Sequence, residues 1–454
     1  MAEKVDVAII GAGSAGLSAL EEVRKATKEF IVVDDGPLGT TCARVGCMPS
    51  KALIQVANEY ERRLHLAGRG IHGGEKLRLD IPEALDCVRK LRDRFAREAV
   101  LSTKRLGSRL VRGRARFAGP GVLRVGKREF RAKRVILATG SRPVLPEEFR
   151  ALGSLVVTSD SLFELEDLPD RIGVIGLGPV GLELGQALSR LGCDVVAFDS
   201  LRSVGKLTDP AVNAHALGLF AEEFSMHFGG EVRLKALARG VAIAAGGRAY
   251  ARDLVFASLG RRPKLDSLGL ETLGVALDEE GVPEFDRGTM RLAGRPVFLA
   301  GDASARRPLL HEASDDGRIA GYNSVHRAVR RFRRLTPLAV TFCEPNIALV
   351  GKSFAELRSG SFVTGAASFE TQARALILGE NRGLLHVYAG AKNGKFLGAE
   401  MIGPAGEHLA HLMSWAIEQE LSVFEMLRMP FYHPTVEEGL RTALRAAAGR
   451  VKSQ

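Results

Sequence analysis

The pattern of hydrophobic and polar positions opens on a short β-branched run, Val5 to Ile10, followed by a glycine-rich turn and a helix-like segment, Leu17 to Lys25. A second apolar run, Phe30 to Val33, ends in Asp34. The order strand, glycine-rich turn, helix, strand, acid is typical of a dinucleotide-binding unit. In such a unit backbone N–H groups and a helix N-terminus contact the pyrophosphate, and the carboxylate contacts a ribose hydroxyl. The turn comprises Gly11, Ala12, Gly13, Ser14, Ala15 and Gly16.

The same order recurs later in the chain. A strand pattern over Ile172–Ile175 precedes a second glycine-rich turn, a helix pattern covers Leu182–Leu191, and the strand pattern Asp194–Phe198 ends at Asp199. The acid follows the first glycine of its turn by the same interval as in the first unit, and a matched duplication argues against chance more strongly than either motif alone. We therefore predict two dinucleotide sites in one chain. The second turn comprises Gly176, Leu177, Gly178, Pro179, Val180 and Gly181.

The acid at position 199 bears on the choice of nucleotide. A carboxylate there accepts a hydrogen bond from the ribose 2′-hydroxyl of NAD and repels the 2′-phosphate of NADP, so Asp199 favours NAD. Arg202, which lies close behind in the sequence, keeps NADP open as the alternative.

The remaining pattern predicts an α/β chain with an α+β C-terminal part. An amphipathic helix is expected from Pro82 to about Leu106, strand-like segments from Ser108 to Lys133, and buried strands at 134–140, 253–259 and 297–302. Toward the C-terminus the chain has the pattern of antiparallel strands followed by helices. The strands expected there are Val340–Val350, Gly360–Phe369, Ala375–Leu378, Leu384–Ala389 and Phe396–Ile402, and the helices are His408–Glu420 and Val423–Leu427.

Composition places the chain among ordinary globular proteins. It has 454 residues, of which 46% are hydrophobic and 26% are charged, enough for several domains and large buried cofactors. The net charge is +11, but no nucleic-acid motif accompanies it, so we expect no nucleic-acid binding. The basic run Arg327 to Arg334 is predicted to be a solvated helix face, with an acidic protein partner as the alternative.

The sequence indicates no membrane or secretory segment. No apolar run reaches the length that spans a membrane, and the first strand pattern begins directly after residues 1–4. We therefore expect a soluble, cytoplasmic protein. In that reducing compartment a disulfide is expected to be transient and catalytic rather than structural.

Two cysteines, Cys42 and Cys47, lie in the segment GTTCARVGCMPSK (39–51), directly after the first dinucleotide unit. A helix pattern from Lys51 to Leu64 places the second sulfur near a helix N-terminus, where a thiolate is stabilised. A redox site is therefore predicted here. Structural thiols are expected at the cysteines that are isolated in sequence, Cys87, Cys193 and Cys343.

His433 is the candidate general acid/base, because an imidazole gains and loses a proton near neutral pH. A carboxylate at Glu437 or Glu438 would orient its ring. His408 and His411 share a helix face but have no further ligands in sequence, so we expect packing residues there and no metal site.

Small residues at strand ends indicate where a cofactor approaches the backbone. Ala138, Thr139 and Gly140 end one buried strand and allow close approach. Gly301 and Asp302 end another. The acid there would hold a cofactor hydroxyl or, alternatively, cap the strand.

The chain resembles the flavin-dependent pyridine nucleotide–disulfide oxidoreductases, and among them most closely the dihydrolipoyl dehydrogenases. The resemblance rests on the two glycine-rich units and, in the family's order, on GPLGTTCARVGCMPSK (36–51), VILATG (135–140), LGRRP (259–263), VFLAGD (297–302) and HPTVEE (433–438). It implies a homodimer with two Rossmann-like domains and a C-terminal dimerisation domain. The implied division is an FAD-binding domain at 1–147, an NAD-binding domain at 148–265, a central part returning to the FAD domain at 266–336, and an interface domain at 337–454.

The resemblance also implies roles for individual residues. Cys42 would attack the substrate disulfide, and Cys47 would exchange electrons with the flavin. Lys51 would lie near the flavin and pair with Glu183. The residues expected to hold FAD are Gly11, Gly13, Ser14, Ala15, Gly16, Asp34, Asp35, Gly39, Thr41, Lys51, Ala138, Thr139, Gly140, Gly301 and Asp302.

The resemblance further implies that His433 reaches the active site of the other subunit, oriented by Glu438. The residues expected to hold NAD are Gly176, Gly178, Val180, Gly181, Asp199 and Gly260. Four positions depart from the family pattern. Asp34 and Asp199 replace the commoner Glu, Thr40 replaces a usual Gly, and Tyr432 precedes the candidate acid/base His433.

The implied activity is the NAD-dependent oxidation of a protein-bound or free dihydrolipoyl group to its disulfide, through a Cys42–Cys47 redox disulfide. A reductase of another small disulfide, such as glutathione, with NAD(P)H is the alternative within the family. A redox-silent flavoprotein that serves as an assembly or sensing module is the alternative from a different class. The expected partners are a second copy of the chain and a lipoyl-bearing carrier protein or small disulfide.

Overall fold

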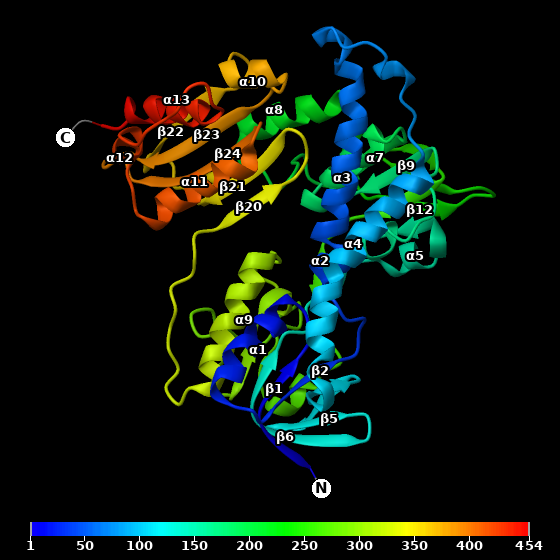
Figure 1. Ribbon diagram of the computed structural model, residues 1–454, viewed down its shortest axis with the longest axis vertical. Helices are drawn as coiled ribbons and strands as arrows, with labels where there is room; N and C mark the ends of the chain where they lie inside the picture. Colours follow the sequence, from blue (N-terminus) through cyan, green and yellow to red (C-terminus); the bar gives the residue numbers. More distant parts are fainter. Residues whose placement is uncertain (1, 453–454) are drawn as a thin grey trace. The chain divides into compact units, whose positions relative to one another are not determined.

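The computed structural model describes residues 2–452 as a mixed α/β protein (Figure 1). The chain forms two compact units, each built from separate stretches of sequence. The first unit comprises Met1–Pro49, Cys87–Val144 and Gly260–Arg334, and the second comprises Ser50–Asp86, Leu145–Leu259 and Leu335–Gln454. Within residues 2–452, no helix is long and apolar enough to cross a membrane.

A nine-stranded sheet forms the core of the first unit. Its central strand β1 (Glu3–Ile10) pairs in parallel with β2 (Phe30–Asp34) on one side and β6 (Arg128–Leu137) on the other. Its C-terminal half, Val7 to Ile10, is buried, as expected of a strand covered on both faces. The other strands are β3 (Leu110–Arg112), β4 (Ala115–Gly119), β5 (Val122–Val125), β17 (Phe285–Asp286), β18 (Arg291–Leu292) and β19 (Val297–Leu299).

Two helices of this unit, α1 (Ser14–Ala26) and α9 (Leu310–Val325), lie side by side against the sheet (Figure 1). A Cβ atom at Gly317 of α9 would lie 2.1 Å from the carbonyl oxygen of Ala15, so only glycine permits this approach. The close packing holds α1, which follows the first glycine-rich turn directly.

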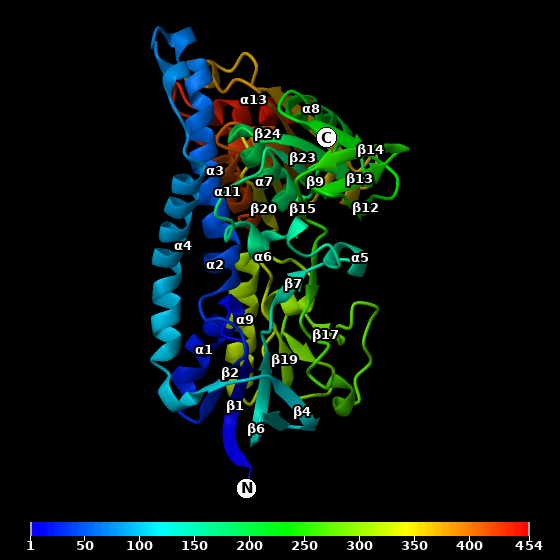
Figure 2. The ribbon, with the colours of Figure 1, turned by 90° about the vertical axis from the view of Figure 1, so that its right-hand side faces the viewer.

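The second unit contains a five-stranded parallel sheet in the order β11-β10-β9-β15-β8. Helix α7 (Pro179–Arg190) connects β9 to β10 and repeats the strand, turn and helix order of the first unit. A small antiparallel sheet, β12-β13-β14, lies beside β9 (Figure 2). The strand bounds are β8 (Val156–Val157), β9 (Arg171–Ile175), β10 (Asp194–Asp199), β11 (Ser225–Phe228), β12 (Arg233–Ala236), β13 (Val241–Ala245), β14 (Arg248–Arg252) and β15 (Leu254–Ala257).

The C-terminal part of the second unit is an antiparallel sheet in the order β20-β21-β24-β23-β22. Helix α11 (Gly406–Glu418) packs on β21 and β24, and α13 (Glu437–Ala448) packs on β22 and β23. Helix α12 (Val423–Leu427) lies against α13. The strand bounds are β20 (Leu338–Thr341), β21 (Asn346–Gly351), β22 (Phe362–Ser368), β23 (Leu384–Gly390) and β24 (Phe396–Gly403).

The cysteine segment leads into two long helices, α3 (Cys47–Arg62) and α4 (Ile81–Lys104). The predicted helices over 51–64 and 82–106 correspond to them, although α3 begins earlier than predicted. Shorter elements include α2 (Thr41–Val45), α5 (Glu147–Arg150), α6 (Ser159–Leu162), α8 (Pro210–Ala221), β7 (Ser141–Pro143) and β16 (Arg261–Pro263).

The prediction of a strand at Ala375–Leu378 was wrong, because this segment belongs to helix α10 (Ala373–Leu378). The Gln372 side chain accepts a hydrogen bond of 2.7 Å from the Ala375 N–H at the start of the helix. Gly379, with a φ of 74°, ends the helix in the left-handed conformation. Capping at both ends therefore decides the conformation of this short apolar run.

The single strand predicted at Val340–Val350 is two strands, β20 and β21, which pair with each other in antiparallel fashion. A turn through residues 342–345 separates them. This turn brings Phe342 and Glu344 against helix α7, and Phe342 takes part in the candidate site.

The basic run Arg327–Arg334 is not a helix, contrary to prediction, because α9 ends at Val325. The Asn323 side chain bonds to both the N–H and the carbonyl of Arg330 and so holds the chain in its non-helical path. Arg334 is also not a solvated residue. Its side chain is 18% exposed and pairs with the carboxylates of Glu312, Asp315 and Asp316 on α9.

His408 and His411 are exposed on α11 instead of packed in the core, because α11 turns Leu409, Ala410 and Met413 inward. Residues 2–452 contain no group of three or more His, Cys, Asp or Glu that could hold a metal ion.

The isolated cysteines differ in their surroundings. Cys343 is buried and Cys193 is half-buried, whereas Cys87 is exposed on α4 and is not the structural thiol that was predicted. Burial raises the pKa of the Cys193 thiol to about 11 and also raises the pKa of Cys343, so both thiols stay protonated at neutral pH.

Candidate functional site

The first glycine-rich turn connects β1 to α1 and has no room for side chains at two of its glycines. A Cβ atom at Gly11 would lie 2.2 Å from the carbonyl oxygen of Ala138, and one at Gly16 would lie 1.9 Å from the carbonyl oxygen of Gly11. At Gly13, by contrast, a Cβ atom would meet nothing within 4 Å. The turn is therefore closed toward the protein and open beside Gly13.

The N-terminus of α1 fits the pyrophosphate of a dinucleotide. Gly13 is its N-cap and supplies no side-chain hydrogen bond, and the first turn carries no acidic residue. Helix N–H groups without a side-chain cap, at the positive end of the helix dipole, attract anionic oxygens. The open space beside Gly13 leads to these groups.

Asp34 closes this turn from the end of β2. Its Oδ2 atom accepts a hydrogen bond from the Ala12 N–H at 2.8 Å, and its Oδ1 atom accepts one from the Gly36 N–H at 2.9 Å. Arg112 adds an ion pair at 3.3 Å. A carboxylate oxygen has two lone pairs, so Asp34 retains acceptor capacity for a ribose hydroxyl.

The other residues predicted to hold FAD differ in their surroundings. Asp35 points to solvent, where its carboxylate pairs with Arg114 at 3.1 Å. Gly39 has a φ of 89°, and a Cβ atom there would lie 3.1 Å from a methyl group of Val100 on α4. Ser14 is the first residue of α1, and Thr41 is the first residue of α2.

The residues after β6 present an unsatisfied polar group. The Ala138 N–H donates to the Ile10 carbonyl at 2.8 Å, which holds this strand end beside the glycine turn. The hydroxyl oxygen of Thr139 is buried, and within residues 2–452 it has no hydrogen-bond partner. Buried hydroxyls are normally satisfied, so an orphaned one next to the glycine turn fits a polar cofactor.

Asp302 follows β19 and accepts a hydrogen bond from the Ser141 hydroxyl at 2.6 Å. The Ser141 oxygen in turn accepts one from Nε of Arg261 at 2.8 Å. The preceding Gly301 N–H donates to Asp316 of α9 at 3.1 Å. Neither residue was among the predicted site residues, although Ser141 directly follows the motif VILATG and Arg261 lies within the motif LGRRP.

The second glycine-rich turn repeats the geometry of the first. A Cβ atom at Gly176 would lie 2.3 Å from the carbonyl oxygen of Ser258, and one at Gly181 would lie 1.8 Å from the carbonyl oxygen of Gly176. At Gly178 it would meet nothing within 4 Å. Helix α7 has Pro179 at its start, no side-chain cap and no acid in its first turn. The start of α7 therefore fits the pyrophosphate of a second dinucleotide in the same way as the start of α1.

Asp199 occupies the position that Asp34 has in the first unit. Its Oδ2 atom accepts a hydrogen bond from the Leu177 N–H at 2.6 Å, and its Oδ1 atom accepts one from the Leu201 N–H at 2.9 Å. Arg202 is exposed. Of the other residues predicted to hold NAD, Val180 is 42% exposed in the first turn of α7, and Gly260 follows β15 with a φ of 89°.

The two cysteines of the motif lie on consecutive helices. Cys42 belongs to α2, and Cys47 is the first residue of α3. A Cβ atom at Gly46 would lie 3.2 Å from the Cα atom of Cys42, so the turn between the helices is tight. Thr40 caps α2 by accepting a hydrogen bond from the Ala43 N–H at 3.2 Å. Both cysteines are half-buried, and Cys47 occupies a helix N-terminus, where negative charge is stabilised.

Lys51, in the second turn of α3, pairs with a buried carboxylate. Its Nζ atom lies 2.8 Å from Oε2 of Glu183 on α7, and the Glu183 side chain is 4% exposed. The other carboxylate oxygen, Oε1, accepts a hydrogen bond from the Phe342 N–H at 2.7 Å. The Phe342 ring faces the ammonium, with its centroid 4.7 Å from Nζ. Phe342 was not predicted as a site residue, because its contact comes from the turn that was predicted as continuous strand.

His433 and Glu438 lie together at the start of α13. The Nδ1 atom of His433 is 3.0 Å from Oε2 and 3.2 Å from Oε1 of Glu438. The Thr435 N–H also donates to Oε2, at 3.3 Å. The carboxylate is therefore fixed from two sides, while the imidazole side chain is 72% exposed. An imidazole that is oriented through Nδ1 can accept or donate a proton at Nε2.

Family models match most of the chain. Residues 5–317 match the pyridine nucleotide-disulphide oxidoreductase model, and residues 338–444 match the dimerisation domain of the same family. The dihydrolipoyl dehydrogenase of Bacillus subtilis (strain 168) is 28% identical over 98% of this chain and 97% of its own length. The dihydrolipoyl dehydrogenase of Thermus scotoductus is 31% identical over 97% of both chains.

Solved structures share the fold over the same extent. The HOCl-induced flavoprotein disulfide reductase RclA of Escherichia coli has a TM-score of 0.84 at 20% identity and covers 98% of this chain and 100% of its own. LpdA of Mycobacterium tuberculosis has a TM-score of 0.85 at 23% identity and covers 97% of this chain and 99% of its own. The chain therefore belongs to the pyridine nucleotide–disulphide oxidoreductases, as a flavoprotein enzyme that uses FAD and a nicotinamide nucleotide and carries the dimerisation domain of the family.

Proposed function

We propose that this protein is a dihydrolipoyl dehydrogenase, which oxidises a dihydrolipoyl group to its disulfide and reduces NAD. The observation that carries the proposal is the His433–Glu438 pair, in which a carboxylate 3.0 Å from Nδ1 orients an exposed imidazole. A dithiol must lose its protons as it becomes a disulfide, and an oriented imidazole is a suitable acceptor. The two bacterial dihydrolipoyl dehydrogenases, at 28% and 31% identity over nearly the full length, support the lipoyl group as the dithiol.

Asp199 supports NAD as the nucleotide. Its carboxylate is bonded to the backbone of the turn through both oxygens, so a negative charge is held at the end of β10. In dinucleotide-binding units this is where the ribose 2′-hydroxyl binds. A 2′-phosphate would meet the carboxylate, and the exposed Arg202 would have to compensate. NADP is therefore the less favoured nucleotide.

FAD would be held by the first glycine-rich turn, by Asp34, by the orphaned Thr139 hydroxyl and by Asp302. When bound, FAD supplies two-electron transfer between a thiol pair and a nicotinamide. Lys51 would place its ammonium beside the flavin, and its ion pair with Glu183 restrains it.

The sulfur chemistry would be carried out by Cys42, Cys47 and His433. Starting from a Cys42–Cys47 disulfide, a substrate thiolate attacks the Cys42 sulfur, the bond to Cys47 breaks, and Cys47 leaves as a thiolate. The second substrate thiol gives its proton to His433 and attacks the substrate sulfur of the mixed disulfide, so that Cys42 also leaves as a thiolate. The substrate is then a disulfide, and the cysteine pair has gained two electrons.

A second copy of the chain would complete this site. His433 lies within the residues that match the dimerisation domain, and its side chain is 72% exposed in the single chain. We therefore propose that it serves the cysteine pair of the other subunit. In this proposal the FAD-binding domain is 1–147, the NAD-binding domain 148–265, the central part 266–336 and the interface domain 337–454. The partner is a lipoyl-bearing carrier protein or a free lipoyl compound.

Differential alkylation tests the redox role of the cysteine pair. The anaerobic holoenzyme is treated with one equivalent of dihydrolipoamide and then with iodoacetamide, and mass spectrometry maps the labelled thiols. We expect Cys42 and Cys47 to gain label only after reduction, whereas Cys87, which is exposed, labels in both states and serves as an internal control. If the labelling of Cys42 and Cys47 is the same before and after reduction, the protein is a redox-silent flavoprotein. A pair reduced by glutathione and not by dihydrolipoamide would indicate a different thiol substrate.

A further inference from the structure

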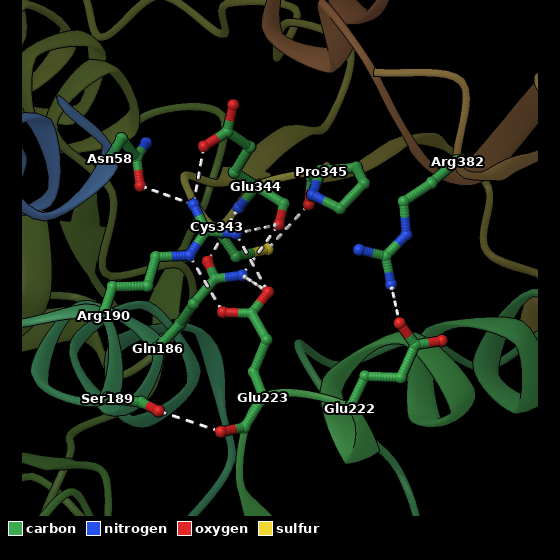
Figure 3. Close-up of polar contacts among 10 residues, drawn as sticks. All are labelled: Asn58, Gln186, Ser189, Arg190, Glu222, Glu223, Cys343, Glu344, Pro345 and Arg382. Carbon is green, nitrogen blue, oxygen red and sulfur yellow. Dashed lines mark hydrogen bonds and ion pairs between the residues drawn. The ribbon is translucent and has the colours of Figure 1, made fainter. Parts of the chain in front are cut away.

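One face of helix α7 binds the turn between β20 and β21. Glu183, Gln186 and Arg190 are spaced at helical intervals, so their side chains leave α7 on the same side. Each of them bonds to the stretch 342–344. Figure 3 shows Gln186 and Arg190 directed at Glu344. The stretch is therefore held along α7 by three successive side chains.

The guanidinium of Arg190 uses each of its five N–H donors. Its Nε and Nη2 atoms bond to the two carboxylate oxygens of Glu223, at 2.8 and 2.9 Å. Its Nη1 atom bonds to Asn58 at 2.7 Å and to the Glu344 carboxylate at 2.6 Å, and Nη2 also reaches the Glu344 carbonyl at 3.1 Å (Figure 3). The side chain is 9% exposed. Burial opposes its charge, but Glu223 and Glu344 outweigh this effect and raise the pKa of Arg190.

Gln186 holds the backbone of Glu344 through both of its polar groups. The amide oxygen of Gln186 accepts the Glu344 N–H at 2.8 Å, and its Nε2 donates to the Glu344 carbonyl at 2.7 Å. Nε2 also donates to Glu223 at 2.8 Å. Because one side chain bonds to the N–H and the carbonyl of the same residue, the turn cannot slide along α7 without losing both bonds.

These contacts restrain Lys51 by two routes. Through the turn, they fix Phe342, whose N–H donates to Glu183 at 2.7 Å and whose ring centroid lies 4.7 Å from the Lys51 ammonium. Through Asn58, Arg190 binds α3 about two turns beyond Lys51. The Arg190 guanidinium therefore restrains both Phe342, which contacts the Lys51 ammonium, and helix α3, which carries Lys51.

We propose that Gln186 and Arg190 are positioning residues, which fix the Lys51 ammonium beside the bound flavin and so help to set the reduction potential of the flavin. The inference rests on the proposed function in placing Lys51 beside the flavin. A fixed ammonium stabilises negative charge that develops when the flavin is reduced, and this effect weakens as the separation grows. Release of the ammonium therefore lowers the potential.

The test measures the midpoint potential of the flavin in the holoenzyme for the wild type, Arg190→Lys, Lys51→Gln and the double variant. Arg190→Lys keeps the charge but offers three donors without the planar fork, so it changes geometry more than charge. Lys51→Gln removes the ammonium and keeps an N–H donor for Glu183. The matched control is Arg171→Lys, which disrupts another two-bond pair in the same unit, between Arg171 of β9 and Asp253.

We expect both variants to lower the potential, because Arg190→Lys releases the Lys51 ammonium from its fixed position and Lys51→Gln removes this ammonium. The double variant should have the same potential as Lys51→Gln alone, since Arg190 acts through Lys51. Arg171→Lys should have the wild-type potential. If Arg190→Lys does not fold, Asn58→Ala takes its place, because it removes a single bond to the guanidinium and should lower the potential by a smaller amount.

A second measurement does not involve the flavin. Hydrogen exchange at the Phe342 amide, which is bonded to the buried Glu183, reports whether the turn is still held against α7. We expect exchange to be faster in Arg190→Lys by about tenfold or more, since bonds to charged groups are lost. Arg171→Lys should exchange at the wild-type rate.

The other possible results separate the positioning role of Arg190 from the placement of Lys51. The positioning role is wrong if Lys51→Gln lowers the flavin potential and Arg190→Lys does not, or if the shifts of the two single variants add in the double variant. In either case Lys51 still lies beside the flavin. If Lys51→Gln leaves the potential unchanged, the inference and the placement of Lys51 are both wrong. A failure of dihydrolipoamide as substrate would leave these potentials untouched and would refute only the proposed substrate.

Discussion

The carboxylate of Glu438 lies 3.0 Å from Nδ1 of His433, and the same carboxylate accepts the Thr435 N–H at 3.3 Å. Glu438 is in the first turn of α13, so the helix fixes the carboxylate and the carboxylate fixes the ring. A hydrogen on Nδ1 then donates to Glu438, which leaves Nε2 for proton transfer. The neighbouring Glu437 offers a matched control, because it carries the same charge one position away.

Removal of this base should slow dithiol oxidation strongly. We expect His433→Gln to lower kcat for dihydrolipoamide by about 10²- to 10⁴-fold, which is the usual contribution of general acid–base catalysis. Glu438→Gln should give a smaller loss, because the ring stays but is less well oriented, and Glu437→Gln should keep wild-type activity. Steady-state rates across pH 6 to 9 measure these effects. Equal losses in Glu437→Gln and Glu438→Gln would contradict the assigned pair.

The Lys51–Glu183 pair should contribute to stability as well as to the site. Glu183 is 4% exposed, so Lys51→Met leaves a buried carboxylate that keeps the Phe342 N–H bond but loses its cation. We expect the free energy of unfolding to fall by about 1–3 kcal/mol. Lys51→Gln should lose less, because its amide can still donate to Glu183. Urea unfolding of the two holoenzyme variants measures the difference in their unfolding free energies. Equal losses in Lys51→Met and Lys51→Gln would show that the unpaired Glu183 carboxylate is not the cause of the destabilisation.

Asp316 should make stability depend on pH. Burial raises its pKa to about 6, against the opposite effect of the Arg334 guanidinium. In the unfolded chain the pKa of an Asp carboxyl is about 3.9. Between about pH 3.9 and pH 6 the folded protein therefore binds a proton at Asp316 that the unfolded chain does not bind. This carboxyl therefore costs stability above pH 6, and the cost is removed as the pH falls toward 4.

The variant Asp316→Asn isolates this effect, because Asn does not titrate and can still accept the Gly301 N–H. Relative to Asp316→Asn, the wild type should gain about 2 kcal/mol of unfolding free energy between pH 7 and pH 4. Contributions from carboxyls far from Asp316 cancel in the difference. Urea unfolding of both proteins at several pH values gives the result. If the wild type instead loses unfolding free energy relative to Asp316→Asn as the pH falls, the pKa of Asp316 is not raised in the folded state.

Asp199 and Asp34 should respond to the same substitution in different ways. Asp199→Asn removes the charge that repels a 2′-phosphate, so we expect the KM for NAD to rise and the preference for NAD over NADP to fall by about tenfold or more. Asp34→Asn should leave nucleotide preference unchanged and weaken FAD retention. Steady-state assays with both nucleotides and the flavin content after dialysis measure the two effects. A loss of NAD preference in Asp34→Asn would contradict the assignment of two separate nucleotide sites.

Much of both dinucleotide units could be predicted from the sequence, because their determinants are local. The glycines at 11, 16, 176 and 181 are required by contacts within the strand–turn–helix unit or with the adjoining strand end. The run Ala375–Leu378 could not be assigned in this way, since four apolar residues fit a strand or a helix. Its conformation depends on the Gln372 cap and on the left-handed Gly379.

Contacts between distant segments were not visible in the sequence. Arg334 belongs to a basic run, and only the folded chain brings it to the three carboxylates on α9. The contacts of Arg190 with Asn58, Glu223 and Glu344 join three separate segments of the second unit. Sequence spacing along α7 indicates a shared face for Gln186 and Arg190, but not what that face binds.

We claim a dihydrolipoyl dithiol as the substrate and NAD as the acceptor. Steady-state oxidation of dihydrolipoamide by the holoenzyme, measured with NAD and with NADP, tests this claim, and the reduction of glutathione disulfide by NADPH is measured in parallel. We predict that kcat/KM for dihydrolipoamide with NAD exceeds each of the other two values by about 10²-fold or more. Faster reduction of glutathione disulfide, or no turnover of dihydrolipoamide by an enzyme whose flavin is still reduced by NADH, would contradict the claim.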